Sequence, residues 1–156
     1  MIGYLHGQVL RVNDRSAILD VGGVGYEVFL SETQLPTVTI GDEISVWTYL
    51  SVRENALELF GFPDEAERQF FEMLLDVSGI GPRSALGIIG LAPIATLRKA
   101  IANNDTSYLT KVSGIGKRTA EKIVVELKDK MAPHLSEGDS AELLETSEVA
   151  EALQAL

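Results

Sequence analysis

The chain has 156 residues, 46% of them hydrophobic, enough for one ordinary core or two small ones. It contains no cysteine, which excludes disulfides, thiolate metal sites and a thiol nucleophile. The two histidines, His6 and His134, stand far apart, so we expect no metal and no cofactor. No charged and apolar leader follows Met1, and no apolar run approaches the ~18 residues of a membrane span, so we expect a soluble, cytoplasmic protein.

The net charge of −10 is unevenly distributed. Residues 71–131 carry nine Lys and Arg against six Asp and Glu, whereas residues 1–70 and 132–156 are both acidic. Because the screening length at physiological salt is only ~8 Å, a local basic surface on an acidic body can still bind nucleic acid.

Residues 1–63 have the pattern of a β domain. The apolar and β-branched runs predict five strands: Tyr4–Val12, Ala17–Val21, Tyr26–Leu30, Ile44–Val52 and Leu57–Phe62. Five short strands fit a small closed barrel better than an open sheet, whose edges would be exposed. Alternation predicts that most of the aromatic residues on these strands pack in the barrel rather than stack on bases: Phe29, Trp47 and Tyr49.

From residue 64 the apolar period becomes helical. Asp64 is expected to cap a first helix, and Pro93 to open a later one that closes at Asn103. The predicted fold class is therefore α+β, with a five-stranded barrel over 1–63 and an all-α domain over 64–133. The acidic stretch 134–148 is expected to be a flexible linker, and the apolar stretch 149–156 the start of a third domain that is largely missing.

One motif occurs twice in the helical half. The stretch "DVSGIGPRSALGII" (76–89) matches "KVSGIGKRTAEKIV" (111–124) at one fixed spacing, which indicates an internal duplication. Each copy predicts a helix, a tight turn and a second helix, with Ile80 and Ile115 anchoring the turns inward. Four glycines can adopt the positive φ that such turns need and leave the backbone uncovered: Gly79, Gly81, Gly114 and Gly116.

Uncovered amides at the start of a helix form an anion site. Arg83 adds positive charge beside the first site, and Lys117 and Arg118 add it beside the second. The motif has Lys111 and Arg118 where a Walker loop needs glycine and Ser or Thr, and it lacks the third glycine of a dinucleotide fingerprint, so a nucleotide is not the expected ligand. Two phosphate sites on one unit suit a polymer of phosphates, that is, a nucleic-acid backbone.

These stretches resemble the helix–hairpin–helix pattern, and the chain as a whole resembles the RuvA family of Holliday junction branch migration subunits. The resemblance includes "MIGYLHG" (1–7), "VGGVGYEV" (21–28), "VRENALELFGF" (52–62), both hairpins and "AEKIVVELKDK" (120–130). It implies an OB-fold barrel, a tandem helix–hairpin–helix domain and a homotetramer. One or two such tetramers would hold a four-way DNA junction open, without reading sequence, for the RuvB motor in recombination and repair.

The resemblance also implies particular residues and partners. The hairpin glycines would grip DNA through their amides, with Arg83, Lys117, Arg118 and Lys122 contacting phosphates. The family's acidic pin, usually Glu followed by Asp, is here Glu54 and Asn55, so half of its charge is absent. RuvC is implied as a further partner, whereas the motor contact depends on the third domain, of which this chain has only the first few residues.

No catalytic residue is expected, because the ATPase of the implied helicase complex belongs to RuvB. Glu54 and Glu58 are interpreted as a solvated loop and strand end rather than nuclease metal ligands. Two alternatives stay open: a generic helix–hairpin–helix module that binds duplex or single-stranded DNA, and a DNA glycosylase. The glycosylase is disfavoured because its catalytic Asp would correspond to Asp139, inside the acidic linker.

Overall fold

A computed structural model describes residues 1–131. The predicted linker 134–148, the segment 149–156 and the end of the predicted domain 64–133 lie outside the described residues, as do His134 and Asp139. No single helix within residues 1–131 is long and apolar enough to span a membrane. The helices Pro82–Ile89 and Ile94–Ala102 reach that length and composition only together, with a bend of 101° between them.

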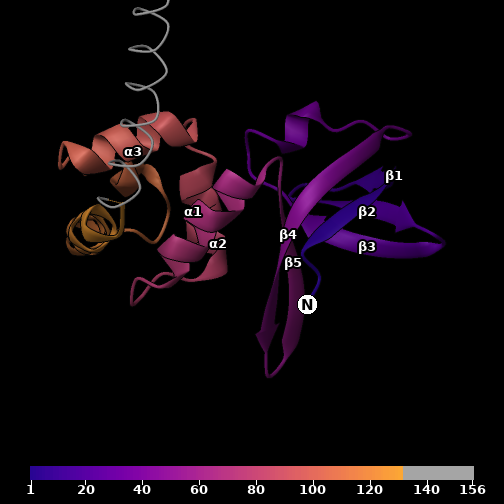
Figure 1. Cartoon of the computed structure of the whole chain (residues 1–156), viewed down its shortest axis with the longest axis horizontal. Coiled ribbons are helices and arrows are strands. Elements are labelled where there is room, and N and C mark those ends of the chain that lie inside the picture. Colours follow the sequence, from indigo (N-terminus) through magenta and orange to yellow (C-terminus); the bar gives the residue numbers. More distant parts are fainter. Residues whose placement is uncertain (132–156) are drawn as a thin grey trace, which may run out of the picture.

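The first half of the described chain is a closed five-stranded barrel (Figure 1), as the sequence predicts. Its strands are β1 (Tyr4–Val12), β2 (Ser16–Val21), β3 (Val24–Phe29), β4 (Glu43–Arg53) and β5 (Ala56–Phe62). They are arranged in the order β1-β2-β3-β5-β4, and β1 pairs with β4 to close the barrel. All neighbours are antiparallel except β3 and β5, which run parallel. The connection from β3 to β4 contains a short 3-10 helix, η1 (Leu35–Thr37).

The second half of the described chain is helical. It contains α1 (Glu65–Leu75), α2 (Pro82–Ile89), α3 (Ile94–Ala102), the 3-10 helix η2 (Leu109–Lys111) and a last helix over residues 117–131. Asp64 caps α1 as predicted, since its side chain accepts a hydrogen bond of 2.8 Å from the Glu67 N–H. Pro82 occupies the first turn of α2, where no N–H is needed.

The barrel has its own core, but β5 also belongs to the core of the helices. The barrel interior is filled by Leu5, Val9, Ala17, Leu19, Val28, Leu30, Val46 and Leu59. Phe60 and Phe62 of β5 pack on Phe71 of α1, with ring centroids 5.4 and 4.8 Å apart, and Tyr49 meets the same ring edge-on at 5.4 Å. Barrel and helices are therefore joined by close-packed aromatic rings.

The three aromatic residues predicted to pack in the barrel do pack against neighbours, but not in its interior: Phe29 and Tyr49 pack against the core of the helices, and Trp47 packs against the exposed Tyr4. Phe29 lies 5.6 Å from Phe60, and Trp47 lies 5.2 Å from Tyr4 in an edge-on arrangement, in addition to the contact of Tyr49 described above. His6 is exposed on β1, where its ring nitrogen Nδ1 hydrogen-bonds the Ser45 hydroxyl at 2.8 Å.

Candidate nucleic-acid interface

The two copies of the motif fold into the same local structure. In the first, the Ile80 N–H donates to the Val77 carbonyl at 3.1 Å, and in the second the Ile115 N–H donates to the Val112 carbonyl at 3.1 Å. Both isoleucines are buried, as the sequence predicts, so each turn is pinned to the core from inside. The duplication in sequence is therefore a duplication in structure.

The four glycines of these turns have two different backbone conformations. Gly79 and Gly114 each have φ of 90°, in the left-handed region that favours glycine. Gly81 has φ of −91° and ψ of 171°, and Gly116 also lies outside the left-handed region. Only the first glycine of each pair therefore uses the positive φ that glycine can adopt. The second glycine is the residue just before a helix, where an extended backbone is normal.

The second glycine of each pair is not required by the protein's own packing. A Cβ built on Gly81 or Gly116 would meet no described atom within 4 Å. Neither sterics nor φ within the described chain therefore explains why both copies have glycine there. Bare backbone at these positions lets an external group approach closely.

Each second glycine lies at the positive end of a helix. The carbonyl of Gly81 accepts from the Ala85 N–H at 3.0 Å, and that of Gly116 from the Ala120 N–H at 2.9 Å, which begins the two helices. No side chain caps α2, and the N–H groups of a first helical turn have no acceptor within their own helix. These amides, together with the helix dipole, favour an anion.

The second hairpin carries exposed cations beside its glycines. Lys117, Arg118 and Lys122 are all exposed on the last helix, and none of them forms an ion pair with another residue of the described part of the chain. Their positive charge is therefore available to a ligand at the start of this helix.

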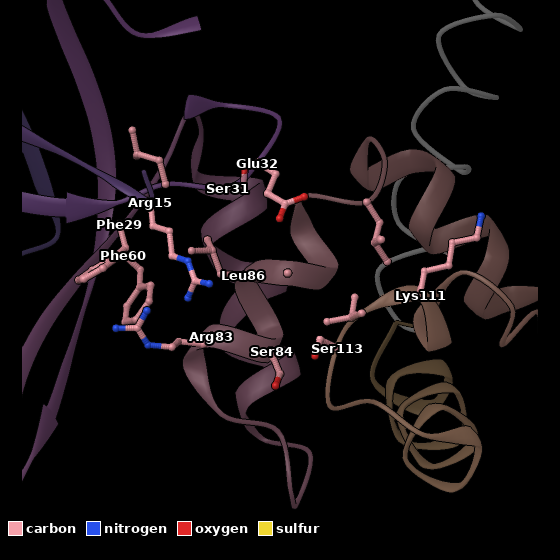
Figure 2. A pocket seen from close by; sticks show the side chains of 14 residues that line it. Arg15, Phe29, Ser31, Glu32, Phe60, Arg83, Ser84, Leu86, Lys111 and Ser113 are labelled. Carbon is pink, nitrogen blue, oxygen red and sulfur yellow. The ribbon is translucent and has the colours of Figure 1, made fainter. Parts of the chain in front are cut away.

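Arg83, at the first hairpin, is directed toward the barrel. Its guanidinium lies 2.9 Å from the Glu58 carboxylate and 4.9 Å from the centre of the Phe29 ring (Figure 2). The structure thus groups Lys117, Arg118 and Lys122 and sets Arg83 apart. Sequence reasoning missed this partner of Arg83, because Glu58 lies 25 residues away in another kind of element.

Glu58 itself is not solvated as predicted. Its side chain is 13% exposed, and it accepts from Arg53 at 2.6 Å as well as from Arg83. No group of acidic or histidine side chains within residues 1–131 could hold a metal ion. The alternation of side chains along β5 could have shown which face of the strand Glu58 occupies. No residue near Glu58 in the sequence, however, indicates a contact with α2.

The two motif copies pack together in one core. Gly87, in the helix after the first turn, lies against Val112, which precedes the second turn; a Cβ on Gly87 would come within 2.9 Å of the Val112 side chain. A cavity of about 490 Å³ opens between the barrel, α2 and this contact, and Arg15, Glu32 and Arg83 are among the residues around it (Figure 2). The small residue at 87 thus sets how closely the two hairpins approach.

The predicted acidic pin is the tip of a long hairpin. Arg53 pairs with Ala56, so Glu54 and Asn55 form a two-residue turn between β4 and β5, and both are exposed. In the view of Figure 1 this hairpin extends beyond the barrel, on the side toward which the loop between α1 and α2 also extends.

Comparison with known proteins agrees with this architecture. Residues 1–61 match the model of the RuvA N-terminal domain, and residues 71–129 match the SAM-like helix–hairpin–helix tandem. A Thermobifida fusca protein named Holliday junction branch migration complex subunit RuvA is 45% identical over 150 residues, covering 96% of this chain and 73% of the relative. The chain belongs to the RuvA family.

Other RuvA proteins show the same relationship over the whole chain. A Thermus thermophilus subunit is 41% identical over 156 residues, which is 100% of this chain and 82% of the relative. An Acinetobacter baumannii subunit is 38% identical, with coverage of 100% and 81%. The predicted family and its two-part α+β fold, an OB-like barrel followed by a helix–hairpin–helix tandem, are therefore confirmed.

Proposed function

We propose that this chain binds four-way DNA junctions as a homotetramer, without reading base sequence, and holds them open for branch migration. The observation that carries the proposal is the pair of uncovered backbone sites at Gly81 and Gly116, on helices that share one core. Membership of the RuvA family supports it, because the relatives are named as Holliday junction branch migration subunits.

The geometry of each site suits a phosphate group of DNA. Free amides at a helix start donate hydrogen bonds to a negatively charged oxygen, and the missing Cβ lets the phosphate come into contact with the backbone. Two such sites on one chain could contact two phosphates of a duplex arm. Contacts of this kind position a protein on DNA and carry no sequence information.

The residues proposed to contact phosphates fall into two groups. Backbone amides would contact phosphates at Gly79, Gly81, Gly114 and Gly116. We expect the phosphate to come closest to the second glycine of each turn. Lys117, Arg118 and Lys122 supply charge at the second hairpin, and Arg83 would supply it at the first once released from Glu58.

The proposed assembly rests on the four arms of the ligand, and the proposed partners rest on membership of the RuvA family. A junction has four equivalent arms and each chain offers one pair of hairpins, so fourfold cyclic symmetry matches protein to DNA. Four copies of the Glu54–Asn55 turn would then meet where the strands cross. The chain acts as a non-catalytic subunit, RuvB supplies the ATPase, and RuvC is the further partner expected of this family.

The test compares binding to a four-way junction and to a linear duplex of equal length at one salt concentration, with the native mass measured in parallel. We expect tighter binding to the junction and a mass four times that of the 16.9 kDa chain. Equal affinity for the two DNAs would favour the generic DNA-binding module instead. A monomeric mass at micromolar concentration would contradict the tetramer.

A further inference from the structure

Glu58 connects the acidic turn to the first hairpin. Its Oε2 lies 2.6 Å from Nη2 of Arg53, and its Oε1 lies 2.9 Å from Nη2 of Arg83. The carboxylate is 13% exposed, whereas the two arginine side chains are 55% and 51% exposed. Each oxygen therefore serves a different element: one holds the base of the turn on β4, and the other holds the first turn of α2.

The register of the hairpin determines this arrangement. Side chains alternate between the two faces of a strand, so Arg53 and Glu58 share one face of the β4–β5 hairpin. Val52 and Leu57, which pair across the strands, occupy the opposite face and are 68% and 72% exposed. Near its tip, then, the hairpin has contacts with α2 on one face and an exposed apolar pair on the other.

Arg83 is itself held in place from two sides. Besides Glu58, its guanidinium lies 4.9 Å from the Phe29 ring centre, a cation–π distance (Figure 2). The backbone of Arg83 follows Pro82 in the first turn of α2, directly after the uncovered Gly81. The ion pair therefore joins the hairpin of the acidic turn to the residue next to a proposed phosphate site.

We propose that Glu58 is a positioning residue that fixes the Glu54–Asn55 turn relative to the first hairpin and thereby sets the preference for a junction over a duplex. This inference rests on the proposed function. A fixed turn keeps the charge of Glu54 near the point where the junction's strands cross. A mobile turn can move away from a duplex that lies across the same surface, so the duplex is repelled less. A mostly buried carboxylate between two arginines restricts that movement more than an exposed ion pair does.

The first test measures how Glu58→Gln changes the ratio of the dissociation constants for duplex and junction. We expect the ratio to fall about two- to fivefold, because the substitution removes the charge that pairs with both Arg53 and Arg83. Glu43→Gln is the matched control: it removes the same charge from the other end of β4, where the carboxylate is 73% exposed and lies 3.5 Å from His6. The control ratio should equal that of the parent.

The second test measures the position of the turn without DNA. Because the chain has no cysteine, Asn55→Cys and Ser78→Cys place spin labels only on the turn and the first hairpin. Double electron–electron resonance, with unlabelled chain in excess to dilute distances between subunits, should give a narrow distribution in the parent. The distribution should broaden when Glu58→Gln is added.

The outcomes separate this inference from the proposed function. An unchanged ratio or an unchanged distance distribution would overturn the positioning role. A lower ratio with an unchanged distribution and a steeper salt dependence would mean that Glu58 only withholds Arg83 from phosphates, and would also overturn it. A parent protein that does not prefer junctions would contradict the proposed function, while the spin-label distances would still decide whether Glu58 positions the turn.

Discussion

Gly79 and Gly114 occupy equivalent places in the two hairpins and share one backbone angle, φ of 90°. Gly81 and Gly116 follow them by two residues, but their glycine is explained neither by φ nor by crowding. The first glycine of each pair is thus a requirement of folding, and the second is a requirement of the proposed ligand. This difference can be measured.

Gly79→Ala and Gly114→Ala should each lower the free energy of unfolding by roughly 1–2 kcal/mol, because a Cβ is disfavoured in the left-handed region. Gly81→Ser and Gly116→Ser should leave it within about 0.5 kcal/mol, since serine is a preferred residue before a helix. Urea unfolding, followed by circular dichroism, gives both values.

The effects of the glycine substitutions on junction affinity should differ from their effects on the free energy of unfolding. The serine hydroxyl of Gly81→Ser or Gly116→Ser would accept hydrogen bonds from the amides proposed for phosphate, and its Cβ would cover the backbone, so junction affinity should fall about tenfold or more. Electrophoretic mobility shift at fixed salt measures this. Stable serine variants that bind as tightly as the parent would contradict the backbone site.

Lys117→Ala combined with Arg118→Ala should weaken binding to all DNA sequences alike. Each lost phosphate contact lowers the slope of log affinity against log salt by roughly 0.9, so two contacts should lower it by about 1.8. Titration at several salt concentrations gives the slope. Lys128→Ala with Lys130→Ala is the matched control, because these residues lie on the same helix but contact Asn104 and Asp76 instead. An equal loss of slope in the control would show a general charge effect.

The charge of the acidic turn should affect shape selection more than affinity. Close charge pairs interact by about 1–4 kcal/mol, enough to bias a choice between junction and duplex but not to outweigh many hairpin contacts. Asn55→Asp, which restores a second charge, should raise the ratio of duplex to junction dissociation constants, and Glu54→Gln should lower it. If both variants remain tetrameric and keep the parent ratio, the turn has no electrostatic role.

Glu67 makes stability depend on pH. Burial raises the pKa of its carboxyl above the usual value for glutamate, and the nearby charge of Asp64 raises it further. Because the pKa is higher in the folded state than in the unfolded state, the charged form is disfavoured by folding, and stability from this group is lost as pH rises through the folded pKa. Glu67→Gln should therefore raise the thermal unfolding midpoint at pH 7.

The advantage of Glu67→Gln should disappear as pH falls below the unfolded pKa, where the parent carboxyl is protonated in both states. Differential scanning calorimetry at pH 7 and pH 3 measures the unfolding midpoints of parent and variant. Glu65→Gln is the control, since Glu65 is exposed in the same turn and lies 3.6 Å from Arg68. An equal gain at both pH values would contradict the pKa argument.

Features encoded locally were predictable from sequence. The strand Tyr4–Val12 has the predicted bounds, and α1 begins directly after the predicted cap Asp64. The duplicated motif located both hairpins because its glycines and buried isoleucines recur at one spacing. In these cases residues close in sequence determine the conformation.

Features that depend on distant contacts were not predictable. The residues next to Glu58 in the sequence predict a solvated strand end. In the structure, the register of the hairpin brings Arg53 to Glu58, and the packing of α2 brings Arg83 to it. The pairing exists only after the barrel and the helices pack together.

The aromatic contact of Phe60 and Phe62 with Phe71 has a mechanical consequence. If DNA is held at the hairpins as proposed, a force on it reaches the barrel through close-packed rings 4.8–5.4 Å apart, a contact that bends little. Protein interiors of this density resist compression. A pull along one arm of a junction would therefore turn barrel and helices as a single stiff body, and in a tetramer the load would be carried to the neighbouring subunits.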